Sequence, residues 1–161
     1  MNTTFKNISR STRITGVFGY PISHTLSPQM HNAAFKFKKL DYIYLPFEVK
    51  PINLKNILKN LPLLGIYGIN LTIPHKEMAF KCVNILSKEA KLTKAVNTIK
   101  VVKNKLFGFN TDGHGFIKSL KIDAKTDPKN KNILVLGAGG AAKGISIALS
   151  LAGAKTLVIA N

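Results

Sequence analysis

Acidic residues are scarce in this sequence of 161 residues, which has 7 aspartates and glutamates against 24 lysines and arginines. The resulting net charge of +17 is typical of proteins that bind nucleic acids or anionic membranes. All of the basic residues except Arg10 and Arg13 are lysines, however, and no aromatic residues interleave with a basic run to stack on bases. We therefore interpret the charge as a solvated surface that attracts small anions, and we expect no nucleic-acid partner. Composition alone leaves an anion or nucleic-acid binder as the alternative.

Cysteine and long apolar runs are also missing. The single cysteine, Cys82, excludes an internal disulfide framework and favours a reducing compartment. The first 13 residues are polar and lack the apolar core of a secretory signal. The most apolar segment, 133–160, is interrupted by Lys143, Lys155 and several glycines, which argues against a membrane span. These absences predict a cytoplasmic protein without a membrane partner.

Two families of catalytic signature are absent. The four histidines show no metal-ligand spacing, and no serine lies in the turn that carries the nucleophile of α/β-hydrolases. We therefore expect no metal site.

Apolar runs alternate with segments of helical periodicity along the chain. The runs predict strands at 14–19, 42–49, 68–73, 96–102, 106–109, 133–136 and 156–159. Helices are expected from Ser27 and Pro28 onward, with Ser27 as the N-cap, and at 51–61, 76–86, 87–94, 111–120 and 143–151. In the second helix we expect the inward residues to be Ile52, Ile57, Leu58 and Leu61. The alternation predicts an α/β fold with a mainly parallel sheet, and the polar stretch 123–131 is the expected linker.

A glycine-rich loop directly follows the predicted strand 133–136. Its spacing matches G-x-G-x-x-G/A with Ala142 in the third position, and a predicted helix and strand follow it. Amides at such a helix start face phosphates, so the loop predicts dinucleotide binding. The expected cofactor residues are Gly137, Ala138, Gly139, Gly140, Ala141 and, at the end of the next strand, Asn161. An acidic residue at the last position would repel a 2′-phosphate, whereas the neutral Asn161 tolerates one and favours NADP.

Three polar groups lie at the ends of predicted elements. Thr25 and Ser27 flank a helix start, where hydroxyls and amides suit a carboxylate, although N-capping alone also explains Ser27. Lys76 follows a strand that ends near Thr72, and it could donate a proton to a carbonyl oxygen. Asp112 opens a helix, where it could serve as a plain N-cap. Composition alone leaves these roles open, because a lysine at the surface of this chain needs no function.

Taken together, five segments resemble the shikimate dehydrogenase family of shikimate and quinate dehydrogenases. They are Gly-Tyr-Pro-Ile-Ser-His-Thr-Leu-Ser-Pro at 19–28, Asn-Leu-Thr-Ile-Pro-His-Lys at 70–76, Ala-Val-Asn-Thr at 95–98, Gly-Phe-Asn-Thr-Asp-Gly at 108–113 and Gly-Ala-Gly-Gly-Ala-Ala at 137–142. They occur in family order and cover nearly the whole chain. Three positions depart from the family pattern: Thr25 stands where serine is usual, His75 where an aromatic residue is common, and Lys94 where glycine is common.

The resemblance implies a substrate-binding and catalytic domain at 1–112 and the start of an NADP-binding domain at 113–161, which is incomplete because the family continues for roughly another hundred residues. It implies reversible NADPH-dependent reduction of 3-dehydroshikimate to shikimate in aromatic amino-acid biosynthesis. Lys76 and Asp112 match the catalytic pair, and the positions that match substrate-binding residues are Thr25, Ser27, Thr72, Lys76, Asn97 and Asp112. An inactive truncated product and a quinate dehydrogenase of broader specificity are the alternatives. A small-molecule substrate is the expected partner, and the sequence leaves a homodimer open.

Overall fold

The computed structural model describes residues 8–161, so residues 1–7 of the polar N-terminal segment lie outside the described part of the chain. Six strands form one sheet in the order β2-β1-β3-β5-β6-β4. They are β1 (Arg13–Gly19), β2 (Tyr42–Glu48), β3 (Ile66–Leu71), β4 (Ile85–Leu86), β5 (Thr98–Val102) and β6 (Lys105–Phe109). β1 pairs in parallel with β2 and β3, and β4 pairs in parallel with β6. β5 alone runs antiparallel to its neighbours, so the predicted mainly parallel sheet is confirmed.

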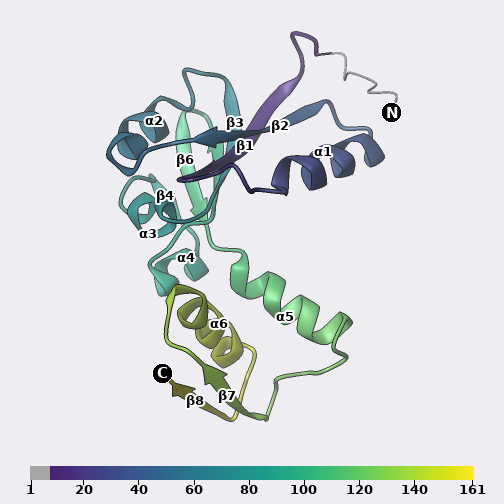
Figure 1. The fold of residues 1–161 in the computed structure, drawn as a ribbon, viewed down its shortest axis with the longest axis vertical. Helices are drawn as coiled ribbons and strands as arrows, with labels where there is room; N and C mark the ends of the chain where they lie inside the picture. The colour runs from purple at the N-terminus through teal and green to yellow at the C-terminus, as the bar shows by residue number, and fades with distance from the viewer. Residues whose placement is uncertain (1–7) are drawn as a thin grey trace.

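Helices cover both faces of this sheet. Helix α1 (Ser27–Phe37) lies on one side, and α2 (Leu54–Asn60), α3 (His75–Phe80) and α4 (Lys88–Thr93) lie on the other (Figure 1). A short 3₁₀ turn, η1 (Pro51–Asn53), precedes α2. The core lies between the sheet and α2, where Leu54, Leu58 and Leu61 are fully buried against Phe18 and Ile69. An α/β layer arrangement of this kind buries one face of each helix and both faces of the central strands.

The turn between β5 and β6 lies in the gap between the predicted strands 96–102 and 106–109. Lys103 and Asn104 both adopt left-handed backbone conformations, with φ of 48° and 60°. Two such residues form the type I′ turn that matches the twist of a two-stranded hairpin.

Three local predictions are wrong. The predicted helix 76–86 ends at Phe80, because the following residues pair with β6 and form β4. Ile52 is 84% exposed, since it lies in the 3₁₀ turn η1 rather than in the regular helix. Leu26, not Ser27, occupies the N-cap position of α1, and no side chain caps this helix.

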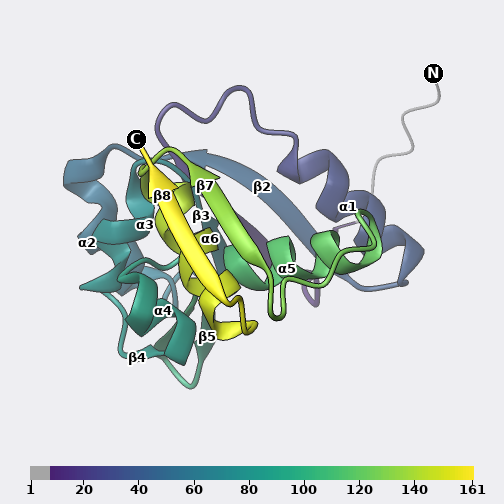
Figure 2. The ribbon, with the colours of Figure 1, turned by 90° about the horizontal axis from the view of Figure 1, so that it is seen from below.

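The last third of the chain forms a smaller unit. Helix α5 (Asp112–Ile122) leads out of the main sheet, and the irregular stretch 123–131 leads on to β7 (Asn132–Leu136). Helix α6 (Gly140–Leu151) then returns the chain to β8 (Thr156–Ala160), which pairs in parallel with β7. Figure 2 shows these two strands side by side with α6 behind them. This is the predicted strand, glycine loop, helix and strand.

Helices α5 and α6 join the two units at a close approach. A Cβ atom at Gly113 would lie 2.7 Å from the Cβ of Ala148, so only glycine fits this position without a shift of the helices. Within residues 8–161, no helix is long and apolar enough to cross a membrane.

The core predicts a clear contrast between two substitutions in one segment. Leu58→Ala should lower the free energy of unfolding by about 2–5 kcal/mol, because Leu58 is 0% exposed and its removal leaves a cavity. The matched control Ile52→Ala should change it by less than about 0.5 kcal/mol, because Ile52 is 84% exposed. Urea unfolding followed by circular dichroism measures both values. Equal losses would contradict the described packing.

Candidate active site

The predicted polar residues gather at one edge of the main sheet. The parallel strands β1 and β3 end there at Gly19 and Leu71, while β5 begins and β6 ends at the same edge. Segments that follow the carboxyl ends of parallel strands meet in space, which is where open α/β sheets carry their sites.

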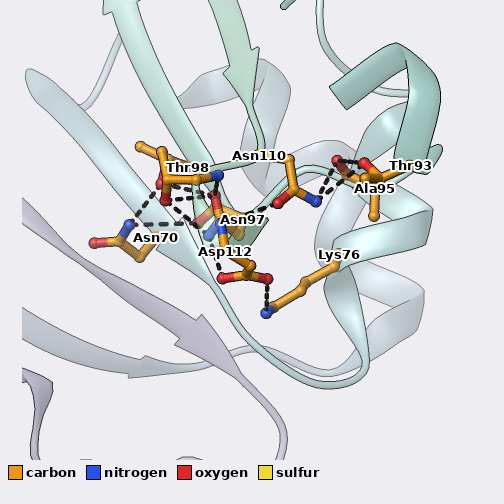
Figure 3. A network of polar contacts seen from close by, with 9 residues as sticks. Asn70, Lys76, Thr93, Ala95, Asn97, Thr98, Asn110 and Asp112 are labelled. Carbon is orange, nitrogen blue, oxygen red and sulfur yellow. Dashed lines mark hydrogen bonds and ion pairs between the residues drawn. The ribbon is translucent and has the colours of Figure 1, made fainter. Parts of the chain in front are cut away.

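Lys76 and Asp112 form an ion pair at the centre of this edge (Figure 3). Lys76 is the second residue of α3 and Asp112 the first of α5, and their Nζ and Oδ2 atoms are 2.6 Å apart. The side chains are 33% and 47% exposed, so both remain within reach of a ligand. Thr111, not Asp112, occupies the N-cap position of α5, so the plain N-cap role that sequence left open for Asp112 is wrong. Its carboxylate is committed to Lys76 instead.

Asn97 holds the second carboxylate oxygen. Its Nδ2 donates to Asp112 Oδ1 at 2.6 Å and to Thr111 Oγ1 at 3.0 Å. Its Oδ1 accepts hydrogen bonds from the Thr111 amide and from Thr98 Oγ1, both at 3.0 Å. Asn97 is only 8% exposed, so this network fixes the orientation of its amide.

A chain of hydrogen bonds links Asn97 through Thr98 and Asn70 to Tyr44, beside the predicted residue Ser27. Asn70 Nδ2 donates to Thr98 Oγ1 at 2.9 Å, and Asn70 Oδ1 accepts from the Tyr44 hydroxyl at 2.7 Å. Burial raises the pKa of Tyr44 to about 12, an effect that the neighbouring Ser27 hydroxyl partly offsets. Tyr44 is therefore a neutral hydrogen-bond donor at neutral pH.

Thr25 and Thr72 stand at the rim of this network. The Ser27 amide donates to Thr25 Oγ1 at 3.3 Å, which places the Thr25 hydroxyl beside the start of α1. Thr72 follows β3 and its amide donates to the Phe18 carbonyl at 3.0 Å. Among the described residues the Thr72 hydroxyl has no hydrogen-bond partner, so it is available to a ligand.

His75 anchors the segment that carries Lys76. Its ring is fully buried, and Nε2 lies 2.8 Å from the Val49 carbonyl oxygen. Since a carbonyl only accepts, Nε2 carries the proton. Nδ1 has no partner among residues 8–161, and burial lowers the pKa of the ring. His75 is therefore neutral at neutral pH and ties the start of α3 to the end of β2.

A cavity of about 510 Å³ connects this network to the glycine loop. Lys76 and Asp112 line it on one side, and Ala141 and Gly144 of α6 line it on the other. Thr25, Ser27, Thr72 and Asn97 do not line this cavity. Asn97 is hydrogen-bonded to Asp112, which does, and Thr72 directly precedes the lining residue Ile73. The structure thus brings the predicted proton donor to the helix that was predicted to hold a cofactor.

The loop itself fits a dinucleotide. Gly137 has a φ of +94°, and its amide donates to the Ala160 carbonyl, which holds the loop against β8. A Cβ atom at Gly139 would meet nothing within 4 Å, so the backbone is open to close approach. The first amides of α6, from Gly140 onward, lack partners within the helix and suit a pyrophosphate. Asn161 Oδ1 accepts from the Ala138 amide at 3.3 Å, so the predicted ribose-side residue lies beside the loop.

Sequence reasoning missed three members of the network, namely Tyr44, Asn70 and Thr98. Asn70 lies two positions before Thr72 in the predicted strand 68–73, where the period of two would have placed both on one face. No comparable signal marks Tyr44, because it reaches Asn70 across β1, the strand between them. Among the described residues, no group of three or more histidine, cysteine or acidic side chains could hold a metal.

Comparison with known proteins decides the family. The family model for the shikimate dehydrogenase substrate binding domain matches residues 17–99. The chain belongs to the shikimate dehydrogenase family. It is 44% identical to the shikimate dehydrogenase (NADP(+)) of Methanopyrus kandleri over 155 residues, which cover 96% of this chain and 53% of the relative. It spans about half the length of the curated relatives that it matches.

Solved structures of similar proteins share the fold. The shikimate 5-dehydrogenase of Listeria monocytogenes, in complex with shikimate and NAD, is 39% identical with a TM-score of 0.91, over 98% of this chain and 54% of that chain. The ligand-free 5-ketofructose reductase of a Gluconobacter strain is 34% identical with a TM-score of 0.88, over 94% and 54%. The fold is therefore shared with an enzyme named for a different ketone.

Burial of His75 predicts a pH-dependent stability. Because its pKa is lowered in the folded state, the unfolded chain binds more protons below the ordinary histidine pKa of about 6.5, and stability falls as the pH drops below that value. His75→Phe should weaken this dependence while preserving the fold. Urea unfolding of the two proteins at pH 7.5 and pH 5.0 measures this difference in stability. The partly buried His31, whose pKa is also lowered, contributes equally to the pH dependence of the unaltered protein and of His75→Phe. An unchanged dependence in His75→Phe would contradict the assignment.

Proposed function

We propose that the protein catalyses the reversible, NADP-dependent reduction of 3-dehydroshikimate to shikimate, in the pathway to aromatic amino acids. The observation that carries this proposal is the Lys76–Asp112 pair, which faces the glycine-loop helix across one cavity. A ketone reduction needs a hydride donor and a proton donor at the same carbonyl group, and this cavity offers a place for both. The names of the relatives support the substrate and cofactor.

The ion pair explains how the chain handles the proton. Lys76 Nζ would hydrogen-bond the ketone oxygen and donate a proton to it as the alcohol forms, and it would accept that proton in the reverse direction. Asp112 fixes the ammonium group at 2.6 Å, and Asn97 fixes Asp112 in turn. NADP, when bound, supplies the hydride chemistry.

The remaining polar residues would orient the substrate. The hydroxyls of Thr25 and Ser27 would bind its carboxylate, helped by the strongly positive charge of the chain. Thr72, Asn97 and Asp112 would bind ring hydroxyls. The free Thr72 hydroxyl and the partly exposed Asp112 carboxylate support these roles.

The cofactor residues are proposed from the fit of the loop. The loop from Gly137 to Ala141 would hold the pyrophosphate, with the amides of Gly139, Gly140 and Ala141 as its donors. The neutral Asn161 would tolerate a 2′-phosphate on the adjacent ribose. Residues 1–112 would then form the substrate-binding and catalytic domain, and 113–161 the start of the dinucleotide-binding domain. The proposed boundary lies at the first residue of α5.

Two measurements test the function directly. Shikimate binding to the 161-residue chain can be followed by ¹H,¹⁵N NMR, where shifts at Ser27, Thr72 and Asp112 are expected. NADPH formation from shikimate and NADP is then assayed with the full-length protein, with quinate and NAD as parallel reactants. A preference for quinate would replace the substrate part of the proposal. Absence of both binding and turnover would identify an inactive product and overturn the proposal.

Lys76→Ala should reduce turnover far more than substrate affinity. The expected loss in kcat is about 10²- to 10⁴-fold, the range that a general acid or base contributes, with a much smaller change in KM. Lys81→Ala is the matched control, because Lys81 is an exposed lysine at the end of the same helix and does not line the cavity. Steady-state kinetics with shikimate measure both. Equal losses in kcat and affinity would remove Lys76 from the proton-transfer step.

A further inference from the structure

We propose that Asn110 is a positioning residue that sets the Asp112 carboxylate, and through it Lys76, for the reaction. This inference rests on the proposed function, since it gives Lys76 and Asp112 their roles. Asn110 does not touch the ion pair directly. It acts on the backbone that carries Asp112.

Asn110 is buried, at 7% exposed, and both its amide nitrogen and its amide oxygen make hydrogen bonds. Its Nδ2 donates to Thr93 Oγ1 at 3.1 Å and to the Ala95 carbonyl at 3.2 Å. Its Oδ1 accepts from the backbone amide of Asp112 at 3.1 Å. Figure 3 shows Asn110 between Asp112 on one side and Thr93 with Ala95 on the other. A buried amide whose nitrogen and oxygen both have partners has one favourable orientation.

These three bonds join two segments that are far apart in sequence. Thr93 is the last residue of α4, and its hydroxyl donates to the Glu89 carbonyl one turn earlier at 2.9 Å. Because the hydroxyl proton is used in that bond, Thr93 Oγ1 is the acceptor in its bond with Asn110. Ala95 leads into Asn97, whose own amide holds the other Asp112 oxygen. Asn110 therefore fixes the segment before Asn97 relative to the segment before Asp112.

A backbone hydrogen bond also connects this segment to Lys76. The Val96 amide donates to the Lys76 carbonyl at 2.8 Å, so the segment that Asn110 holds is also hydrogen-bonded to the start of α3. Both partners of the 2.6 Å ion pair are thus hydrogen-bonded to the segment 95–97, which Asn110 helps to hold. Asn110 also lines the 510 Å³ cavity, on the wall next to Asp112.

Kinetics of Asn110→Ala test the proposal. We expect kcat to fall about 10- to 100-fold, the loss associated with misplacement of a catalytic group by about 1 Å, with a much smaller change in the KM for shikimate. Asn84→Ala is the matched control, because Asn84 also binds a backbone group, accepting from the Leu106 amide at 2.8 Å, but has no link to Asp112. Its kcat should be unchanged. A loss of thermal stability with unchanged kcat in Asn110→Ala would overturn the proposal.

A milder pair of variants guards against misfolding. Thr93→Val removes the hydroxyl that receives the Asn110 bond while preserving side-chain shape, and Thr93→Ser keeps that hydroxyl. Thr93→Val should lower kcat in the same direction as Asn110→Ala, and Thr93→Ser should restore it. Equal kcat in the two Thr93 variants would contradict the proposed route.

The crystal structure of Asn110→Ala decides the claim without any assay. The Asp112 carboxylate should be displaced from Lys76 or occupy several conformers. An Asp112 side chain that stays in place at the same distance from Lys76 would overturn the positioning role. If the unaltered protein proves inactive, the proposed function fails, while this structure still decides whether Asn110 sets Asp112.

Discussion

The carboxylate of Asp112 is the constraint on which this site depends. Its two oxygens are held by different segments, one by the Lys76 ammonium and one by the Asn97 amide, both at 2.6 Å. A half-exposed ion pair of this kind contributes at most about 1 kcal/mol to stability. The buried amides behind it must all find partners, since an unsatisfied buried polar group costs about 1–3 kcal/mol. The arrangement therefore defines a geometry more than it stabilises the fold, which is the pattern expected of a functional site.

The sheet explains why these groups meet. β1 and β3 run in parallel and end together, whereas the antiparallel β5 begins where they end. A strand start and two strand ends therefore contribute side chains to one edge. If β5 ran parallel, Thr98 would lie at the opposite edge of the sheet, and Asn97 could not reach Asp112. The single reversed strand is thus part of the site.

Much of this could be predicted from the sequence because the informative residues are close together along the chain. The glycine loop, the turn at Lys103 and Asn104, and the polar residues at element ends all carry local signals. Lys94 occupies a position where the family commonly has glycine, and its backbone shows why. It adopts a left-handed conformation with φ of 53°, the reason that glycine suits this position in the family.

Other features depend on tertiary contacts that no local pattern records. Residues 85 and 86 form β4 because they pair with β6 at the edge of the sheet. The local sequence, in contrast, favoured a helix that continues to residue 86. Tyr44 joins the site only because a second strand brings Asn70 within 2.7 Å of its hydroxyl. The role of Asn110 depends on the Thr93 and Ala95 oxygens, which the fold brings within hydrogen-bonding distance of its side chain.

The proposed reaction also requires a fixed relation between the two units. A hydride and a proton must reach neighbouring atoms of one carbonyl group, so the glycine-loop helix and Lys76 have to be held relative to each other. The consecutive residues Asp112 and Gly113 hold the two units in this relation. The first orients Lys76, and the second allows α5 to approach Ala148 of α6 more closely than any side chain would permit. One turn of α5 therefore couples the proton donor to the helix that would carry the cofactor. A shift of α6 along α5 would change the distance between the two reacting groups without breaking a single bond in the polar network.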